Sequence, residues 1–374
     1  MRIALVTRRF DPAGGGTERD LVVTARALAE AGHGVTIYAA ETRAPVSEWR
    51  VRGVGGPPLG RASGLWWFAR AAGARARRDG AEIVLSFARI TDADILRSGG
   101  SAHVSYVQAA RQWRGAVGAL ALRLGPYHRV QMTVERRGFT SPSLKKAIAV
   151  SNLVRDDLVR TFALAPAKVT TLYNGVDLQR FSLARNPAAR LELRQALGIP
   201  DKAPVAVFAG NGFARKGLGF LLEAWPQIDV NARLLVAGND RALPAYERLA
   251  RRLGISGRVL FLGQQANVER LFQMADALAL PSLFEPFGNV VMEAMAAGLP
   301  VLATTRCGVA EVMPGVMRPF LVEDPANPAE IATRLGHLLE ARDGAIAAAA
   351  RATAERFTWA RYGEELNALI ASLR

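Results

Sequence analysis

The chain alternates short apolar runs with stretches in which apolar residues recur every three or four positions. In the first half, the apolar runs Ile3–Thr7, Val35–Ala39, Ile83–Phe87 and Ala147–Val150 have the length of buried strands. Between the first two runs, Thr17–Ala31 carries its leucines, valines and alanines at helical spacing. Strands that alternate with helices form parallel sheets covered by helices, so this half predicts a doubly wound α/β domain.

The same alternation starts again at Val205 and continues to Thr304. The expected elements are strands at 205–210, 233–237, 259–262, 277–280 and 300–304, with helices at 217–225, 244–253, 268–275 and 289–297. We therefore predict two domains, residues 1–180 and residues 200–355, joined within the polar segment Gln179–Pro204. Such folds bind ligands beyond the carboxyl ends of their strands, so two facing domains predict a cleft there.

Composition narrows the class of protein. The chain has 374 residues, of which 50% are hydrophobic, enough for two domain cores. It contains no run of about 18 apolar residues, so no transmembrane helix is expected. The apolar start Met1–Val6 is too short for a signal peptide and fits a first buried strand. With Cys307 as its one cysteine, the chain forms no internal disulfide, and we expect a reducing, cytoplasmic setting.

The net charge of +15 is concentrated in the first half. Residues 1–180 contain 27 Lys and Arg against 14 Asp and Glu, whereas the remainder contains 21 against 19. Such a positive field attracts an anionic partner: a phosphorylated substrate, an acidic lipid surface or a nucleic acid. Because no helix-turn-helix, zinc or RNP-type signature accompanies the charge, we expect no nucleic acid partner.

The loop Asp11–Thr17, between the first strand and the first helix, is suited to hold a ligand. It contains Gly15 and Gly16, and glycines let the backbone approach a bound group closely. The helix that follows offers free N–H groups at its start, which favour phosphate. The loop lacks the G-x-G-x-x-G pattern, so it does not predict a dinucleotide site.

A second loop, Asn211–Gly217, follows a strand and precedes a helix. It contains Gly212 and places two adjacent cations, Arg215 and Lys216, beside backbone amides. A departing diphosphate requires such a combination, because its developing negative charge is stabilised by cations without a metal.

The segment Pro281–Pro300 carries two glutamates eight positions apart. Glu285 lies in a loop after a strand, where a carboxylate can reach sugar hydroxyls. Glu293 lies about one turn into the next helix, where it can reach ribose hydroxyls. Three amides between them coincide with the start of that helix and favour a bound anion: those of Phe287, Gly288 and Asn289.

This segment resembles the E-x7-E signature of the family 4 retaining glycosyltransferases. Arg215-Lys216-Gly217 matches their phosphate-binding Arg-Lys, and Asn174–Asp177 matches the strand end between their domains. The resemblance extends over essentially the whole chain. It implies a GT-B fold of two Rossmann-like domains, the second holding a nucleotide sugar and the first an acceptor, with a C-terminal helix at about 359–374 crossing back to the first domain.

A narrower resemblance concerns the acceptor. Gly15–Asp20 and Cys307-Gly308 are similar to segments of lipopolysaccharide core glucosyltransferases that act on heptose. The stretches Leu122–Leu124, His128-Arg129 and Glu135–Phe139 resemble their basic segment that contacts the membrane. Around them, Arg111–Lys146 carries eight Lys and Arg against one acid, Glu135. Three aromatic residues are interleaved with these cations: Trp113, Tyr127 and Phe139. Such a composition suits an anionic leaflet, so we expect a peripheral protein on the inner face of the cytoplasmic membrane.

The resemblance also points to residues of the first domain. Many relatives carry a histidine near the reacting sugar, in the loop that here reads Gly99–His103, so His103 is expected to donate a hydrogen bond to a hydroxyl of the donor sugar. Some relatives carry an acidic residue just before this histidine, but Gly100 takes that place here and no acid role is assigned to it. Asp20 is expected to orient the acceptor or the hexose.

The reaction that the resemblance implies retains the anomeric configuration without a covalent enzyme intermediate. The acceptor hydroxyl attacks the face from which the diphosphate leaves. The expected catalytic residues are Arg215, Lys216, Glu285, His103 and Asp20. The expected nucleotide-sugar contacts are Gly15, Gly16, Gly212, Arg215, Lys216, Glu285, Phe287, Gly288, Asn289, Val290 and Glu293. The first-choice donor is UDP-glucose, with UDP-galactose, UDP-N-acetylglucosamine and GDP-mannose also open, and no cofactor is expected.

Asp92-Ala93-Asp94 spells the D-x-D pattern of some metal-dependent glycosyltransferases. Those enzymes have a different, single-domain fold, and the tripeptide is predicted here to open a helix. No Cys/His cluster offers a zinc site, so we expect no metal site.

Three alternatives stay open at this stage. The first is a transferase of the same fold with another acceptor, such as a phospholipid or an exopolysaccharide intermediate. The second is a nucleotide-sugar epimerase built on the same two domains. The third, motivated by the basic half, is a nucleic-acid binder without enzymatic activity.

Overall fold

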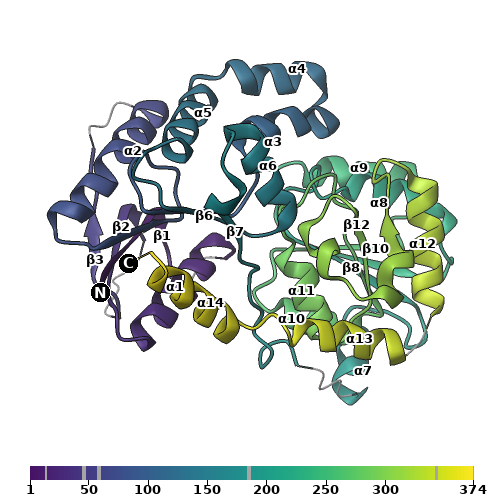
Figure 1. Cartoon of the computed structure of the whole chain (residues 1–374). Helices are drawn as coiled ribbons and strands as arrows, with labels where there is room; N and C mark the ends of the chain where they lie inside the picture. Colours follow the sequence, from purple (N-terminus) through teal and green to yellow (C-terminus); the bar gives the residue numbers. More distant parts are fainter. Residues whose placement is uncertain (13–14, 44–47, 57–59, 183–186, 342–343, 374) are drawn as a thin grey trace. The chain divides into compact units, whose positions relative to one another are not determined.

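The computed structural model describes residues 1–12, 15–43, 48–56, 60–182, 187–341 and 344–373. The chain divides into two compact units (Figure 1). The first consists of Met1–Gly175 together with Trp359–Arg374, and the second of Val176–Thr358. The division therefore falls ahead of the polar segment in which the sequence analysis placed the join.

The first unit is built on a seven-stranded sheet whose neighbouring strands are all parallel. In the order β3-β2-β1-β4-β5-β6-β7, its strands are β3 (Val51–Gly53), β2 (Gly34–Thr42), β1 (Arg2–Phe10), β4 (Ile83–Ser86), β5 (Ile95–Ser98), β6 (Lys146–Ala149) and β7 (Val169–Thr171). The four strands expected from apolar runs are confirmed. The other three were missed because arginine, serine, threonine or glycine takes up half or more of each: Val-Arg-Gly in β3, Ile-Leu-Arg-Ser in β5 and Val-Thr-Thr in β7.

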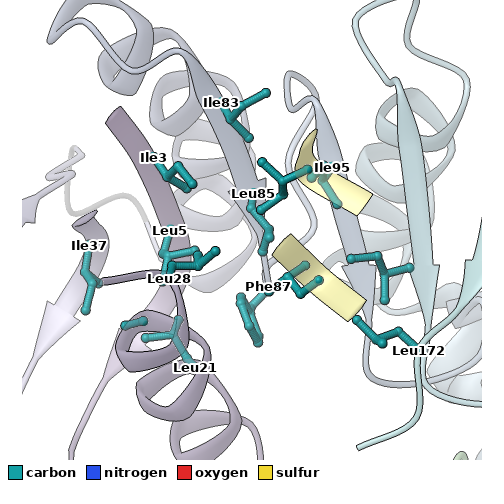
Figure 2. Packing of buried hydrophobic residues seen from close by; sticks show 14 of the residues in the cluster. Ile3, Leu5, Leu21, Leu28, Ile37, Ile83, Leu85, Phe87, Ile95 and Leu172 are labelled. Carbon is teal, nitrogen blue, oxygen red and sulfur yellow. The ribbon is translucent and has the colours of Figure 1, made fainter. Parts of the chain in front are cut away.

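Helices cover both faces of this sheet, as parallel strands require. They are α1 (Thr17–Glu30), α2 (Arg61–Arg78), α3 (His103–Ala109), α4 (Arg111–Leu124), α5 (Pro126–Phe139), α6 (Asn152–Phe162) and α14 (Trp359–Ala371). On one face, Ile3 and Leu5 of β1 pack against Leu21 and Leu28 of α1 (Figure 2). Leu366 of α14 belongs to the same cluster, so the last helix of the chain completes the core of the first unit.

The second unit repeats the plan with a six-stranded parallel sheet. In the order β10-β9-β8-β11-β12-β13, its strands are β10 (Val259–Gly263), β9 (Arg233–Ala237), β8 (Val205–Ala209), β11 (Ala277–Ala279), β12 (Val301–Thr304) and β13 (Leu321–Val322). Its helices are α7 (Pro187–Ala196), α8 (Leu218–Ala224), α9 (Leu243–Arg252), α10 (Val268–Met274), α11 (Asn289–Ala296), α12 (Pro328–Glu340) and α13 (Gly344–Ala354). The strands and helices expected between 205 and 304 are all present, and no end is shifted by more than one residue.

The prediction that Asp92-Ala93-Asp94 opens a helix is wrong. These residues connect β4 to β5, and the carboxylate of Asp94 accepts the amide of Val84 at 2.9 Å. Arg77 of α2 pairs with both aspartates, at 3.2 Å each, so their charges are neutralised within the fold. In the described part of the chain, no group of three or more His, Cys, Asp or Glu side chains is arranged for a metal ion.

None of the helices among the described residues combines the length and the apolar character needed to cross a membrane.

Candidate functional site

In the second unit, two cations converge on one carboxylate. Arg215 and Lys216 follow β8, whereas Glu285 follows β11, its neighbour in the sheet. Nη1 of Arg215 and Nζ of Lys216 lie 2.9 Å and 2.7 Å from the same oxygen, Oε2 of Glu285. Because adjacent parallel strands end at the same edge, the fold brings together residues that are 69 and 70 positions apart.

The backbone around these cations is shaped by glycines. Gly217 has φ +78°, and a Cβ added there would meet the carbonyl oxygen of Pro281. Gly210 has φ +126°, and a Cβ there would lie 2.7 Å from the side chain of Lys216. Both positions therefore require glycine, for conformation and for space. The result is a tight turn that keeps Lys216 only 7% exposed.

The charge of Glu285 is set by its partners. Burial by itself raises the pKa of this carboxyl, but the positive charges of Lys216 and Arg215 outweigh burial and hold the pKa below its ordinary value. Glu285 is therefore ionised at neutral pH. Arg215 also donates to the carbonyl oxygen of Phe284 at 2.7 Å, which fixes the guanidinium against the same loop.

The Glu285 loop is supported by a second loop, Arg306–Val309, which follows β12. The amide of Glu285 donates to the carbonyl of Arg306 at 3.1 Å, and the amide of Gly308 donates back to the carbonyl of Glu285 at 3.0 Å. The amide of Val309 and the thiol of Cys307 both donate to the carbonyl of Phe287, at 2.8 Å and 3.0 Å. Burial, and then the charge of Glu285, raise the pKa of the Cys307 thiol to about 12, so it remains protonated.

The other donor contacts predicted in the second unit lie on or beside the same loops. Gly288, with φ +103°, directly precedes the eight-residue helix α11, and a Cβ there would lie 2.7 Å from Sγ of Cys307. Asn289 and Val290 begin this helix, and Glu293 is buried four residues beyond its first residue. Gly212, with φ +77°, lies in the turn that carries Arg215.

In the first unit, Asp20 is part of a buried polar cluster. Nη2 of Arg97, on β5, donates to Oδ2 of Asp20 at 2.9 Å and to Oδ1 of Asn174 at 2.6 Å. The side chains of Arg97 and Asp20 are 1% and 6% exposed. The sequence analysis named Asp20 but missed Arg97, because an arginine in so short a strand gives no signal of its own.

Gly15 and Gly16 precede α1, and the amide of Asp20 donates to the carbonyl of Gly16 at 3.0 Å. Gly16 has φ +60°. The other two small residues of the predicted loop, 13 and 14, lie outside the described residues.

His103 begins α3 and is hydrogen-bonded on two sides. Its Nε2 lies 2.9 Å from Nδ1 of His128, and the planes of the two rings are nearly parallel, with an angle of 7° between them. Its backbone amide donates to Glu135 at 2.6 Å, and Glu135 also pairs with Arg89 at 3.0 Å. Burial, with the nearby Arg89 and His128, lowers the pKa of His103 to about 4, so the ring is neutral near pH 7. His128 lies within the basic segment Arg111–Lys146, and its pairing with His103 was not expected from the sequence.

The basic segment forms α4 and α5. Gly115 interrupts α4 with φ +68°. Beyond this point α4 presents three aliphatic side chains to solvent: Val117 (83% exposed), Leu120 (54%) and Leu124 (63%). Arg111, Arg114 and Arg123 on the same helix are exposed as well.

Two family models match the chain. Residues 14–180 match the model of Glycosyltransferase Family 4, and residues 189–356 match that of Glycosyl transferases group 1. The two matches together span most of the chain.

Curated relatives are similar over part of their length. An uncharacterized glycosyltransferase of Methanocaldococcus jannaschii, MJ1607, is 29% identical over 227 residues, 59% of this chain and 58% of that protein. A D-inositol 3-phosphate glycosyltransferase of Xylanimonas cellulosilytica is 34% identical over 214 residues, 54% of this chain and 51% of that protein. The match thus spans between half and three fifths of these relatives.

Solved structures are similar over the whole chain. WaaG, a glycosyltransferase involved in lipopolysaccharide biosynthesis, has a TM-score of 0.81 at 23% identity, covering 97% of this chain and 98% of WaaG. Anabaena Alr3699/HepE in complex with UDP and glucose has a TM-score of 0.76 at 19% identity, covering all of both chains. These similarities confirm the predicted fold class of two Rossmann-like domains.

Proposed function

The chain belongs to the glycosyltransferases of the GT-B type, and on this basis we propose that it transfers a hexose from a UDP-sugar to a glycolipid acceptor. UDP-glucose is the first candidate for the donor, and the core of lipopolysaccharide is the first candidate for the acceptor. The donor proposal is supported by the similar structure that contains UDP and glucose. The acceptor proposal is supported by the likeness to WaaG.

One observation carries the proposal: Arg215 and Lys216 converge on a single oxygen of Glu285. A diphosphate carries more negative charge than one carboxylate and offers more acceptor oxygens. On binding, it takes over both cations and releases Glu285 toward the hydroxyls of the sugar. Lys216 is nearly removed from water, which strengthens its attraction for the charge that develops on the leaving phosphate.

The rest of the donor is assigned to the neighbouring elements of the second unit. Glu293 on α11 binds the ribose hydroxyls, and the amides at the start of α11 face the diphosphate. Gly212 leaves the Asn211–Gly217 turn free of a side chain at that position, so that the backbone can approach the donor.

We propose retention of configuration without a covalent intermediate. Glu285 is assigned to the hydroxyls of the sugar and not to the anomeric carbon, so it does not act as the nucleophile. The acceptor hydroxyl attacks the anomeric carbon from the side on which the diphosphate departs. As the C–O bond to the acceptor forms, the bond to the leaving oxygen breaks, and the β-phosphate oxygen accepts the proton of the hydroxyl. His103 donates a hydrogen bond to a hydroxyl of the donor sugar.

The acceptor side includes a membrane contact. The aliphatic side chains of α4 beside exposed arginines match the surface of an anionic leaflet, with apolar atoms for the acyl boundary and cations for the headgroups. We therefore place the protein on the inner face of the cytoplasmic membrane, where a glycolipid acceptor is available.

A second candidate is a transferase of the same type with a phosphorylated polyol or phospholipid acceptor. It is favoured by the curated relatives named D-inositol 3-phosphate glycosyltransferase, at 34% identity. Only the acceptor differs between the two candidates.

The test has two steps. A thermal-shift screen over UDP-glucose, UDP-galactose, UDP-N-acetylglucosamine and GDP-mannose identifies the donor, since a ligand at 100 times its Kd adds about 2.7 kcal/mol to the free energy of unfolding. The best donor is then incubated with heptose-terminated lipid A core, phosphatidylinositol, inositol 3-phosphate and a polyprenyl-linked glycan. NMR of the product gives the anomeric configuration. A protein that no sugar nucleotide stabilises overturns the proposal.

A further inference from the structure

Arg97 takes no part in the proposed chemistry, yet its charged side chain is almost completely buried, at 1% exposed. Its guanidinium is held by Asp20 and Asn174 and lies 4.8 Å from the centre of the Phe87 ring. Removing a charge from water costs several kcal/mol, and replacing a buried ion pair by apolar residues often leaves stability unchanged or improves it. Stability alone is therefore a weak reason for an arginine here.

The partners of Arg97 lie on three separate segments of the first unit. Asp20 is in the first turns of α1, and Asn174 directly precedes Gly175, where this part of the first unit ends. The third partner is Tyr362 on α14, and the hydroxyl of this tyrosine also interacts with the guanidinium. Thr24 of α1 donates to the hydroxyl of Tyr362 at 3.2 Å. One side chain of the sheet thus fixes the start of α1, the exit of the chain from the first unit and the helix with which the chain returns.

The contact with Asp20 reaches the glycine loop directly. The amide of Asp20 donates to the carbonyl of Gly16, so the side chain of Asp20 is held by the sheet while its backbone holds the loop. Gly16 has φ +60°, and because a glycine has no side chain, its backbone can move to other conformations at little cost. Gly16 caps α1, so contacts that hold the first turn of this helix also hold the end of the loop: Arg97 supplies the buried one through Asp20, and Arg9 supplies another through Glu18 at 2.7 Å.

We propose that Arg97 is a positioning residue: through Asp20 it holds the start of α1, and with it the Gly15–Gly16 loop, in the arrangement that the acceptor requires, without touching the substrate. This inference rests on the proposed function, because it takes the glycine loop as part of the substrate site. Arg97→Lys keeps the positive charge, but an ammonium cannot donate to Asp20 and Asn174 from the position of Nη2 and also supply the planar group that lies over the Phe87 ring and interacts with Tyr362.

Two variants test the proposal, Arg97→Lys and the double variant Asp20→Leu/Arg97→Met, which replaces the buried pair by apolar side chains. Arg194→Met in the second unit is the matched control. Arg194 is also 1% exposed and paired with an aspartate, Asp276, at 2.9 Å, but it lies on α7 and bonds residues that precede β8 and β11, whereas Arg215 follows β8. The measurements are the melting temperature, UDP affinity by calorimetry, and kcat and acceptor KM with UDP-glucose and heptose-terminated lipid A core.

Both test variants are expected to lower kcat/KM for the acceptor at least about tenfold, because small displacements of positioning groups have large kinetic effects. UDP affinity is expected to stay within about twofold of the wild type, because the residues proposed to bind the diphosphate and the ribose lie in the second unit. Arg194→Met is expected to lower the melting temperature and keep kcat/KM. A double variant that melts like the wild type and also transfers like it overturns the proposal.

Hydrogen exchange gives a second readout that needs no acceptor. Arg97→Lys is expected to speed amide exchange in the peptide covering residues 15–23, whereas Arg194→Met leaves that peptide unchanged. If amide exchange in the peptide covering residues 15–23 is the same in Arg97→Lys as in the wild type, Arg97 does not hold the loop, and this result stands even if the double variant fails to fold. If the wild type transfers no sugar to any acceptor, the proposed function fails instead, and the exchange result still decides whether Arg97 holds the loop.

Discussion

Nζ of Lys216 lies 2.7 Å from Oε2 of Glu285, at a position where both side chains are largely withdrawn from solvent. The contact joins a cation expected to bind the diphosphate to a carboxylate expected to bind the sugar. In the structure each is the partner of the other. On the proposed function, donor binding replaces an existing ion pair instead of filling an empty site. Lys216 is desolvated when the chain folds, so the donor does not have to remove water from this ammonium.

Lys216→Ala is expected to lower kcat by a factor of about 10² to 10³ at saturating donor, since loss of one preorganised group at a developing oxyanion has this effect in other enzymes. Steady-state release of UDP with the identified acceptor measures it. Lys202→Ala, which removes an exposed lysine of the same unit, serves as the control and should leave kcat unchanged. Near-native turnover of Lys216→Ala would refute the role given to this lysine.

Gly288→Ala is expected to weaken UDP binding and to destabilise the second unit by about 1 to 3 kcal/mol. The reason is both conformational and steric, because Gly288 has φ +103° and a Cβ there would lie 2.7 Å from Sγ of Cys307. Urea unfolding and calorimetry with UDP measure the two effects. Gly257→Ala is the matched control, since no atom lies within 4 Å of the position of its added Cβ. Equal behaviour of the two variants would show that the Gly288 turn is not required.

Acid is expected to destabilise the protein partly through His103. Its pKa is about 4 in the folded chain, below the value of about 6.5 that it takes when unfolded. As pH falls from about 7 to about 4, the unfolded state therefore binds a proton that the folded state does not, and stability is lost across this window. The charged and titratable groups around His103 are Arg89 and His128, which with burial lower its pKa, and Glu135, which accepts its backbone amide and pairs with Arg89.

The measurement is urea unfolding at several pH values between about 7.5 and 4.5, the window set by the two pKa values of His103. His103→Gln is expected to show a shallower loss of stability with acid than the wild type. His337→Gln, at an exposed position of α12, should follow the wild-type curve. If His103→Gln and the wild type lose stability in parallel as the pH falls, the pKa of His103 is not lowered in the folded protein.

The membrane contact predicts that Val117→Ser/Leu120→Ser/Leu124→Ser reduces binding to vesicles rich in phosphatidylglycerol by about tenfold or more, because each side chain loses apolar burial in the leaflet. Flotation at low and at high salt measures the binding. The control is Val230→Ser/Val316→Ser, which alters two exposed valines of the second unit, 74% and 50% exposed. Equal flotation of the triple variant and the wild type would remove α4 from the contact.

Long elements were the easiest to predict from the sequence. Helix α1 is 14 residues long and carries its buried apolar residues at helical spacing. Strand β1 contains the apolar run Ile3–Val6, which is buried on both faces, so each element has a clear pattern. Strand β7 reads Val-Thr-Thr, so it forms no apolar run, whereas the equally short β11 is apolar throughout and was predicted. Asp92–Asp94 was misassigned because acidic residues also favour helix starts, whereas here pairing with Arg77 and the amide of Val84 decided their place.

The candidate site was predictable as far as it depends on local motifs. The turn at Arg215 and the loop at Glu285 each occupy a few consecutive residues, and their glycines and charges are visible in the chain. The support of the Glu285 loop by Arg306–Val309 and the pairing of His103 with His128 join distant segments, so no local pattern announces them.

The sequence by itself determined the alternation of strands and helices, the positions of the glycine turns and the residues that carry charge, because each depends on neighbours in the chain. Only the tertiary structure decided which charges meet. Adjacent parallel strands end at one edge, which sets Lys216 against Glu285, and the passage of Arg97 through the core of the first unit sets it against Asp20, Asn174 and Tyr362. Such contacts depend on strand order, and strand order is fixed by the packing of the whole unit.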